Sequence, residues 1–181
     1  MFIWRIIKEK EPLYVCEEME NTMADKPLVT NAMRLLKSAG IEYEVRTYEV
    51  DENDLSGVSV AQKVGLPPEE VFKTLVLCGE KKGVMVCVVP VELEIDLKKL
   101  AQAAGDKKVE MVAMKELLPL TGYIRGGCSP IGMKKKYATY IDETCLLAER
   151  IAVSAGVRGA QVIVNTEQLI AYTEAVVCEV T

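Results

Sequence analysis

The sequence predicts one domain of the α+β class, built on a mixed, largely antiparallel sheet or a barrel-like sheet that short helices flank. The chain has 181 residues, 50% of them hydrophobic, which is enough to bury one ordinary core. Segments with helical spacing alternate along it with short runs typical of strands. Several of those runs are joined by tight turns, such as residues 79–83, and tight turns join antiparallel neighbours.

The helices are predicted from residues that cap helix ends. Thr30 can cap a helix whose apolar residues repeat at helical spacing until Gly40. Asp96 and Gly105 bracket a second helix in the same way, and Asn165 opens the last one. The helices expected from these patterns cover residues 31–39, 59–64, 97–104 and a segment that begins after residue 165.

Strands are predicted from short runs rich in β-branched residues between turn residues. The runs 151–153 and 161–164 flank a glycine-containing turn and are expected to pair with each other. The other expected strands cover residues 43–50, 71–78, 84–89, 108–112, 138–141 and 175–180.

Residues 1–25 are predicted to be an N-terminal extension, either variable or the product of a misassigned start, and residues 26–181 to form the domain. The patterned sequence begins near Pro27, and methionines stand just ahead of it. Residues 1–7 are apolar, but they are too few to span a bilayer and lack the cleavage site of a signal peptide. No association with a membrane is therefore expected.

The composition excludes several classes of function. The chain has no histidine, and its six cysteines are scattered without a C-x-x-C pair. A zinc site, a Ser-His-Asp or Cys-His catalytic centre and a disulfide framework are therefore not expected, and no metal or cofactor is predicted. Scattered cysteines of this kind are typical of a reducing compartment, which predicts a cytoplasmic protein.

Charge is distributed unevenly along the chain. The net charge is −5, but residues 98–136 carry nine basic and three acidic residues, a local charge of +6 that leaves −11 on the remainder. A basic sector on an acidic protein suits an anionic ligand bound at one place and not a coat of DNA. The simpler interpretation is a solvated, lysine-rich surface.

A lone lysine and a glycine-rich loop are the main candidates for chemistry. Lys73 lies in the apolar strand 71–78, where an ammonium is costly unless it is paired or faces a pocket. The loop 126–132, Gly-Gly-Cys-Ser-Pro-Ile-Gly, offers backbone N–H groups that can approach an oxygen anion. Alternatively, Lys73 extends along the sheet edge into solvent and the loop is a plain turn. Cys128 has no histidine to activate it and is interpreted as a passive small residue, unless Lys73 or Arg125 lowers its pKa.

Several segments of the chain resemble the YbaK/EbsC family, which is related to the editing domain inserted in bacterial prolyl-tRNA synthetases. The resemblance covers about residues 28–181, and its most specific part is a Lys-Thr-Leu strand followed by a Gly-Gly-x-Ser-Pro-x-Gly loop. The segments that carry it are residues 47–49, 71–75, 96–100, 107–111, 121–123, 126–132, 153–154 and 158–159.

The resemblance implies an aminoacyl-tRNA deacylase, with Cys-tRNA(Pro), and also Cys-tRNA(Cys), as the expected substrate. The protein would supply no nucleophile, because the cysteinyl thiol attacks its own ester carbonyl. Such a pocket needs orientation and oxyanion stabilisation rather than a base. Lys73 would orient the substrate, and the backbone of Gly126 and Gly127 would hold the carbonyl oxygen. The residues implied for substrate binding are Tyr48, Thr74, Ser129, Pro130 and Ser154, and those implied for tRNA binding are Arg125, Lys134, Lys135 and Lys136.

Two departures from the family leave the specificity open. Residues 51–60 contain no aromatic side chain where the family usually has one, and Gln161 stands where YbaK-type members often carry an aspartate. One alternative is a sister deacylase for Ala-tRNA(Pro) or another small aminoacyl ester. Another is a non-catalytic module that binds charged tRNA ends or docks on a synthetase, and a weaker one is a small-molecule sensor. A partnership with prolyl-tRNA synthetase is left open.

Overall fold

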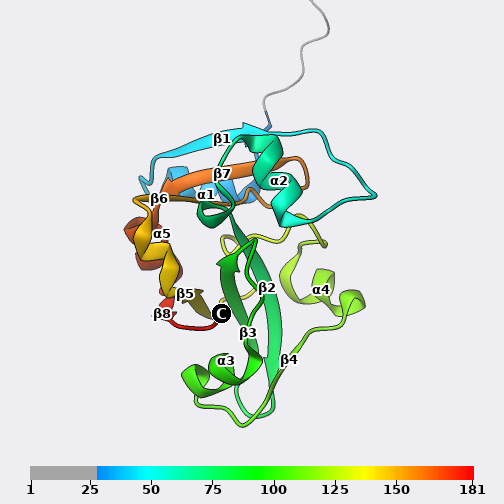
Figure 1. Ribbon diagram of the computed structural model, residues 1–181, viewed down its shortest axis with the longest axis vertical. Helices are drawn as coiled ribbons and strands as arrows, with labels where there is room; N and C mark the ends of the chain where they lie inside the picture. The colour runs from blue at the N-terminus through cyan, green and yellow to red at the C-terminus, as the bar shows by residue number, and fades with distance from the viewer. Residues whose placement is uncertain (1–27) are drawn as a thin grey trace, which may run out of the picture.

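Eight strands in two sheets form the framework of residues 28–181, the part of the chain that the computed structural model describes (Figure 1). One sheet has the order β1-β7-β6 and the other the order β4-β2-β3-β5-β8. The N-terminal extension predicted for residues 1–25 lies outside the described residues. The strands are β1 (Tyr43–Thr47), β2 (Phe72–Gly79), β3 (Gly83–Pro90), β4 (Val109–Met111), β5 (Ala138–Asp142), β6 (Arg150–Ser154), β7 (Ala160–Asn165) and β8 (Val176–Cys178).

Most of the neighbouring strand pairs, counted over the two sheets together, are antiparallel. The pairs β3·β5 and β5·β8 are parallel, and the other four are antiparallel. A parallel bridge between Val71 and Ala152 connects the two sheets. The predicted mixed, largely antiparallel architecture is confirmed. Within residues 28–181 the sheets are open, so the barrel-like form is not the one adopted.

The predicted helices form where the capping residues indicate. The Thr30 hydroxyl accepts a hydrogen bond from the Met33 N–H at the start of α1, and the Asp96 carboxylate and the Asn165 amide cap α3 and α5 in the same way. Across residues 28–181, no helix is long and apolar enough to cross a membrane. The helices are α1 (Asn31–Ser38), α2 (Gly57–Val64), α3 (Leu97–Ala104), α4 (Met114–Thr121) and α5 (Thr166–Thr173), with short 3-10 turns η1 (Pro68–Glu70) and η2 (Glu143–Leu147).

Helix α4 is not among the predicted elements. Ala113 precedes it without a capping side chain, and Pro119 lies inside it. Both features argue against a helix at the level of sequence, because proline lacks the backbone N–H that a helix uses. The helix nevertheless forms, and it flanks the site described below.

An apolar cluster fills the junction between the two sheets and holds α2 over it. Its fully or nearly buried members come from α2, from the bridge and from both sheets: Ala61, Val64, Val71, Val91, Ala152 and Ile163. Gly57 begins α2 directly against Val91, since a Cβ at Gly57 would lie 2.4 Å from the Val91 Cγ1. The start of α2 is therefore fixed beside the start of β2.

Candidate active site

The first half of β2 has an uncovered edge, and the candidate site is built along it. Among the described residues, β3 pairs with all of β2, whereas β4 pairs only with its last three residues. The Val112 N–H then donates to the Val76 carbonyl at 3.0 Å, where this pairing ends. In an antiparallel pair, alternate residues direct their backbone groups away from the partner strand. The Val91 N–H donates to the Val71 carbonyl, so the backbone of Val71 faces the chain of β3. Thr74 lies an odd number of residues further along, and its backbone groups therefore point away from β3, toward the uncovered edge.

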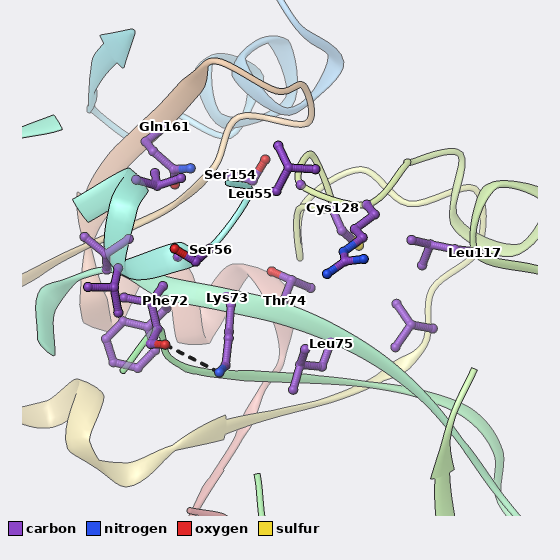
Figure 2. Close-up of a pocket in the computed structure, with 18 of the residues that line it drawn as sticks. Leu55, Ser56, Phe72, Lys73, Thr74, Leu75, Leu117, Cys128, Ser154 and Gln161 are labelled. Atoms are coloured by element: carbon purple, nitrogen blue, oxygen red, sulfur yellow. Dashed lines mark hydrogen bonds between the residues drawn. The ribbon is translucent and has the colours of Figure 1, made fainter. Parts of the chain in front are cut away.

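A pocket of about 710 Å³ lies along this edge, with walls from both sheets (Figure 2). In Figure 2, Gln161 and Ser154 lie toward one end of the pocket and Leu117 toward the other. The residues predicted for the site that line the pocket are Tyr48, Lys73, Thr74, Arg125, Gly126 and Ser154. Apolar residues line both ends of the pocket, and the wall at the Leu117 end comprises Leu75, Met111, Val112, Met114 and Leu117.

Lys73 lies at the rim of the pocket with only weak partners. Its Nζ donates to the Glu94 carboxylate at 3.1 Å and to the Val91 carbonyl at 3.4 Å. The Glu94 side chain is 91% exposed, and an ion pair with so exposed a partner contributes at most about 1 kcal/mol. An oxygen atom of a ligand can therefore replace the Glu94 carboxylate at the ammonium at little cost.

Two buried oxygen atoms in the pocket lining have no hydrogen-bond partner in the described structure. They are the Thr74 Oγ1 on β2 and the Gln161 Oε1 on β7. An unsatisfied buried polar group costs about 1–3 kcal/mol. The Gln161 Oε1 can only accept a hydrogen bond, whereas the Thr74 hydroxyl can donate or accept. A ligand with an amino group and an oxygen atom would satisfy both.

The two glycines of the loop differ in what their backbone can do. Gly126 lines the pocket with φ +82°, and within residues 28–181 its N–H has no acceptor. Gly127 is buried, and its N–H donates to the Ile124 carbonyl at 3.0 Å. Of these two amides, the one at Gly126 is therefore the hydrogen-bond donor available to a ligand.

Cys128 lines the pocket as a protonated thiol. Burial raises its pKa to about 12, and a thiol with so high a pKa is a poor nucleophile at neutral pH. In the described part of the chain, no three His, Cys, Asp or Glu side chains are placed to hold a metal ion.

Ser129 and Pro130, predicted to bind substrate, lie outside the pocket lining. Ser129 is completely buried, and its hydroxyl oxygen accepts from the Ile131 N–H at 3.3 Å. Pro130 lines a second hollow of about 310 Å³. The chain thus turns away from the pocket after Cys128.

The lysine run predicted to bind tRNA also lies outside this pocket. The Lys134 Nζ donates to the Leu118 carbonyl near the end of α4, and Lys136 forms an ion pair with Glu174. Lys135 and Lys136 line the second hollow beside Pro130. Arg125 is the member of the predicted tRNA-binding set that lines the first pocket.

Sequence reasoning missed the apolar wall of the pocket. Met111 and Met114 are 50% and 58% exposed, and Leu117 extends the same wall on α4. The spacing of Met114, Leu117 and Leu118 is helical and could have indicated α4, had Pro119 not argued against it.

Comparisons with a family model and with known proteins agree on one family for this chain. Residues 54–172 match the family described as "Aminoacyl-tRNA editing domain". The chain is 46% identical over 152 residues to a protein of Enterococcus faecalis named "Putative Cys-tRNA(Pro)/Cys-tRNA(Cys) deacylase EbsC", with 84% of this chain and 93% of the relative covered. It is 27% identical over 127 residues to YwhH of Bacillus subtilis, with 68% and 80% covered.

The fold is similar to that of solved structures. One, described as "Crystal structure of a putative trans-editing enzyme for prolyl tRNA synthetase", superposes with a TM-score of 0.72 at 24% identity. The match covers 85% of this chain and 99% of that one. At this identity the likeness concerns the fold alone.

Proposed function

The chain belongs to the aminoacyl-tRNA editing domain family, and from this premise we propose that it is a deacylase that hydrolyses mischarged aminoacyl-tRNA in trans, with Cys-tRNA(Pro) as its substrate. The choice of a cysteinyl ester is supported by the name of the relative that is 46% identical to this chain. Charged tRNA is a substrate found in the cytoplasm, which is where we propose that the protein acts.

This proposal rests on the pocket lining, in which no described residue forms a Cys-His or Ser-His nucleophile. The chain has no histidine, and burial raises the pKa of the Cys128 thiol to about 12. The Ser154 hydroxyl oxygen accepts from the Gly156 N–H at 3.2 Å, and no base among the described residues contacts it. A cysteinyl ester brings its own thiol, which is ionised by a few per cent near neutral pH.

The proposed reaction uses that thiol in the first step. The sulfur attacks the ester carbonyl carbon, so a C–S bond forms and the ester C–O bond breaks. The proton of the thiol ends on the ribose oxygen of the released tRNA. Water then hydrolyses the resulting cyclic thioester to free cysteine. The protein's part is to hold the thiol against the carbonyl and to stabilise the oxyanion, for which the Gly126 N–H is the proposed donor.

The size of the pocket suits an aminoacyl-adenosine better than an amino acid alone. Its 710 Å³ is well above the volume of a cysteinyl group. We assign the part of the pocket near Gln161 and Ser154 to the aminoacyl ester, because the Gln161 Oε1 can accept from the α-amino group. The part beside the apolar wall of Leu75, Met111 and Leu117 suits the terminal adenine base. Lys73, between the two parts, would bind a ribose or ester oxygen.

The test is release of the amino acid from Cys-tRNA(Pro), Ala-tRNA(Pro) and Pro-tRNA(Pro), with and without prolyl-tRNA synthetase. We expect hydrolysis of the cysteinyl ester and a large loss in Lys73→Ala. Lys99→Ala is the matched control, because Lys99 also contacts one glutamate and one main-chain oxygen, that of Thr181, but lies outside the pocket lining. An S-methylcysteinyl ester should resist hydrolysis, since its sulfur cannot attack.

Each other outcome would change the proposal in a defined way. Preference for the alanyl ester would move the protein to the sister activity, and hydrolysis of the S-methyl ester at the cysteinyl rate would refute attack by the substrate thiol. Failure to cleave any ester, even with the synthetase present, would leave a binding module.

A further inference from the structure

Arg158 contacts the glycine loop from outside the pocket. It lies on the turn between β6 and β7, and it is not among the pocket-lining residues. Its Nε donates to the Arg125 carbonyl at 2.8 Å. Its Nη1 donates to both oxygens of the Glu52 carboxylate, at 2.8 and 2.6 Å. One guanidinium thus joins the loop that carries Gly126 to the segment between β1 and α2.

The same turn packs against the glycine loop and against the end of β1. A Cβ at Gly127 would lie 3.0 Å from the Val157 carbonyl carbon, so the two backbones touch. The Tyr48 N–H donates to the Gly159 carbonyl at 2.9 Å. Arg158 therefore stands where three segments that line the pocket meet.

The bond to the Arg125 carbonyl has a geometric consequence for Gly126. The Arg125 carbonyl and the Gly126 N–H belong to one planar peptide group, and within residues 28–181 every peptide bond is trans. In a trans peptide the C=O and the N–H point in opposite directions. A guanidinium that holds the oxygen from outside the pocket therefore directs the N–H toward the pocket, where Gly126 is part of the lining.

Without this bond the peptide group would be free to rotate. Glycine tolerates φ of either sign, so Gly126 itself does little to keep its φ at +82°. Rotation by half a turn would present the Arg125 carbonyl to the pocket instead, and a carbonyl oxygen would repel an oxyanion. The orientation of the donor must come from a contact outside the loop.

We infer that Arg158 is a positioning residue for the reaction, which holds the 125–126 peptide so that the Gly126 N–H faces the substrate carbonyl, and that Glu52 keeps the guanidinium in place. The inference rests on the proposed hydrolysis. It assigns to a side chain outside the pocket a role in transition-state stabilisation and none in substrate binding.

The test compares Arg158→Ala with Arg46→Ala. Arg46 is the matched control, because its Nε donates to Glu44 and its Nη1 to the Val64 carbonyl, and none of these three residues lines the pocket. We expect Arg158→Ala to lower kcat for Cys-tRNA(Pro) by about 10²-fold, the effect of losing one oxyanion donor, with KM changed by less than about threefold. Millimolar guanidinium should restore part of this activity, and Arg46→Ala should keep kcat.

A second measurement does not depend on activity. In ¹⁵N-labelled protein, Arg158→Ala should shift the Gly126 amide resonance and change its hydrogen exchange, and Arg46→Ala should leave it in place. Arg158→Lys serves if the alanine variant does not fold, since an ammonium keeps the charge but lacks the planar fork that reaches both partners.

The outcomes separate the inference from the proposed function. If the native protein hydrolyses the ester and Arg158→Ala keeps its kcat, or loses activity through KM alone, the inference is overturned and the deacylase stands. An unmoved Gly126 amide also overturns it. If the native protein cleaves no ester although the amide shifts as expected, the proposed function fails while the contact keeps its structural effect.

Discussion

Replacing Gly127 with alanine should test how closely the reaction depends on the position of the glycine loop. The added Cβ would lie 3.0 Å from the Val157 carbonyl carbon and 3.1 Å from the Arg158 nitrogen. Ordinary contact begins at 3.4 Å. Gly127 has no positive φ, so alanine fits its backbone conformation. The strain comes from contact with backbone atoms, which no change of rotamer can relieve.

The magnitude follows from the required displacement. Restoring ordinary contact moves the loop by about 0.4 Å away from the turn. A misplacement of about 1 Å can cost about 10²-fold in rate, and a shift of 0.4 Å on the same logarithmic scale corresponds to about sixfold. The overpacking should also cost about 1–3 kcal/mol of unfolding free energy. We therefore expect Gly127→Ala to fold and to lose about sixfold in kcat.

The assay measures kcat for Cys-tRNA(Pro) together with urea unfolding. The control is Gly79→Ala, in which the new Cβ would lie 2.3 Å from the Asp106 Oδ2, at the β2–β3 hairpin outside the pocket lining. It should lose stability and keep kcat. If Gly127→Ala is destabilised and its kcat equals that of Gly79→Ala, the link between loop position and reaction is refuted.

Three further outcomes are expected. Asp142→Asn should lose about 2–4 kcal/mol in urea unfolding at pH 7, because the 1% exposed carboxylate accepts four hydrogen bonds, among them those of the Thr144 and Val180 N–H groups. Burial acts to raise the pKa of Asp142, but these hydrogen bonds outweigh it and hold the pKa below its usual value. Its stabilisation is therefore complete above the unfolded pKa of about 3.9 and is lost as the pH falls through the lower folded pKa. A stability difference from the native protein that stays constant as the pH is lowered from 7 through this range would contradict this. Cys128→Ala should keep kcat within about threefold, since a thiol with a pKa of about 12 does not attack, and a 100-fold loss would make it a participant. Replacing Lys134–Lys136 with alanine should make the slope of log K for tRNA binding against log salt concentration shallower by about one to three. The smaller change is expected if Lys136 stays paired with Glu174 when the tRNA binds. An unchanged slope would exclude the lysine run from the interface.

The elements that the sequence predicts are those with local causes. Thr30, Asp96 and Asn165 cap their helices with their own side chains, and the hairpin at residues 79–83 needs only adjacent strands. Helix α4 lacks such a cause, because Ala113 cannot cap it and Pro119 opposes it. Its formation depends on contacts that are distant in sequence. Strand pairing is equally non-local, as in the parallel pairing of Met85 with Ala138.

In the candidate site, too, the residues with local signals could be predicted and those placed by distant contacts could not. Lys73 and Gly126 could be predicted because an ammonium in an apolar strand and a double glycine are unusual in themselves. Ser129 could not be separated from its neighbours, because the direction of each residue in an irregular loop follows no period. Arg158 was visible only as part of a motif. Its contact with Arg125 spans 33 positions and arises only from the fold.

The pocket exists because one sheet is left incomplete. Strand β4 has three residues, and its pairing with β2 ends at Val76. Had β4 continued, its next residues would have paired with Leu75 and Thr74 and covered the edge. Instead the chain turns at Ala113 into α4, so the segment that uncovers the edge also supplies the apolar wall beside it. An uncovered strand edge invites pairing with another chain. Here α4 and the glycine loop flank the edge, which leaves room for a small ligand and little for a strand.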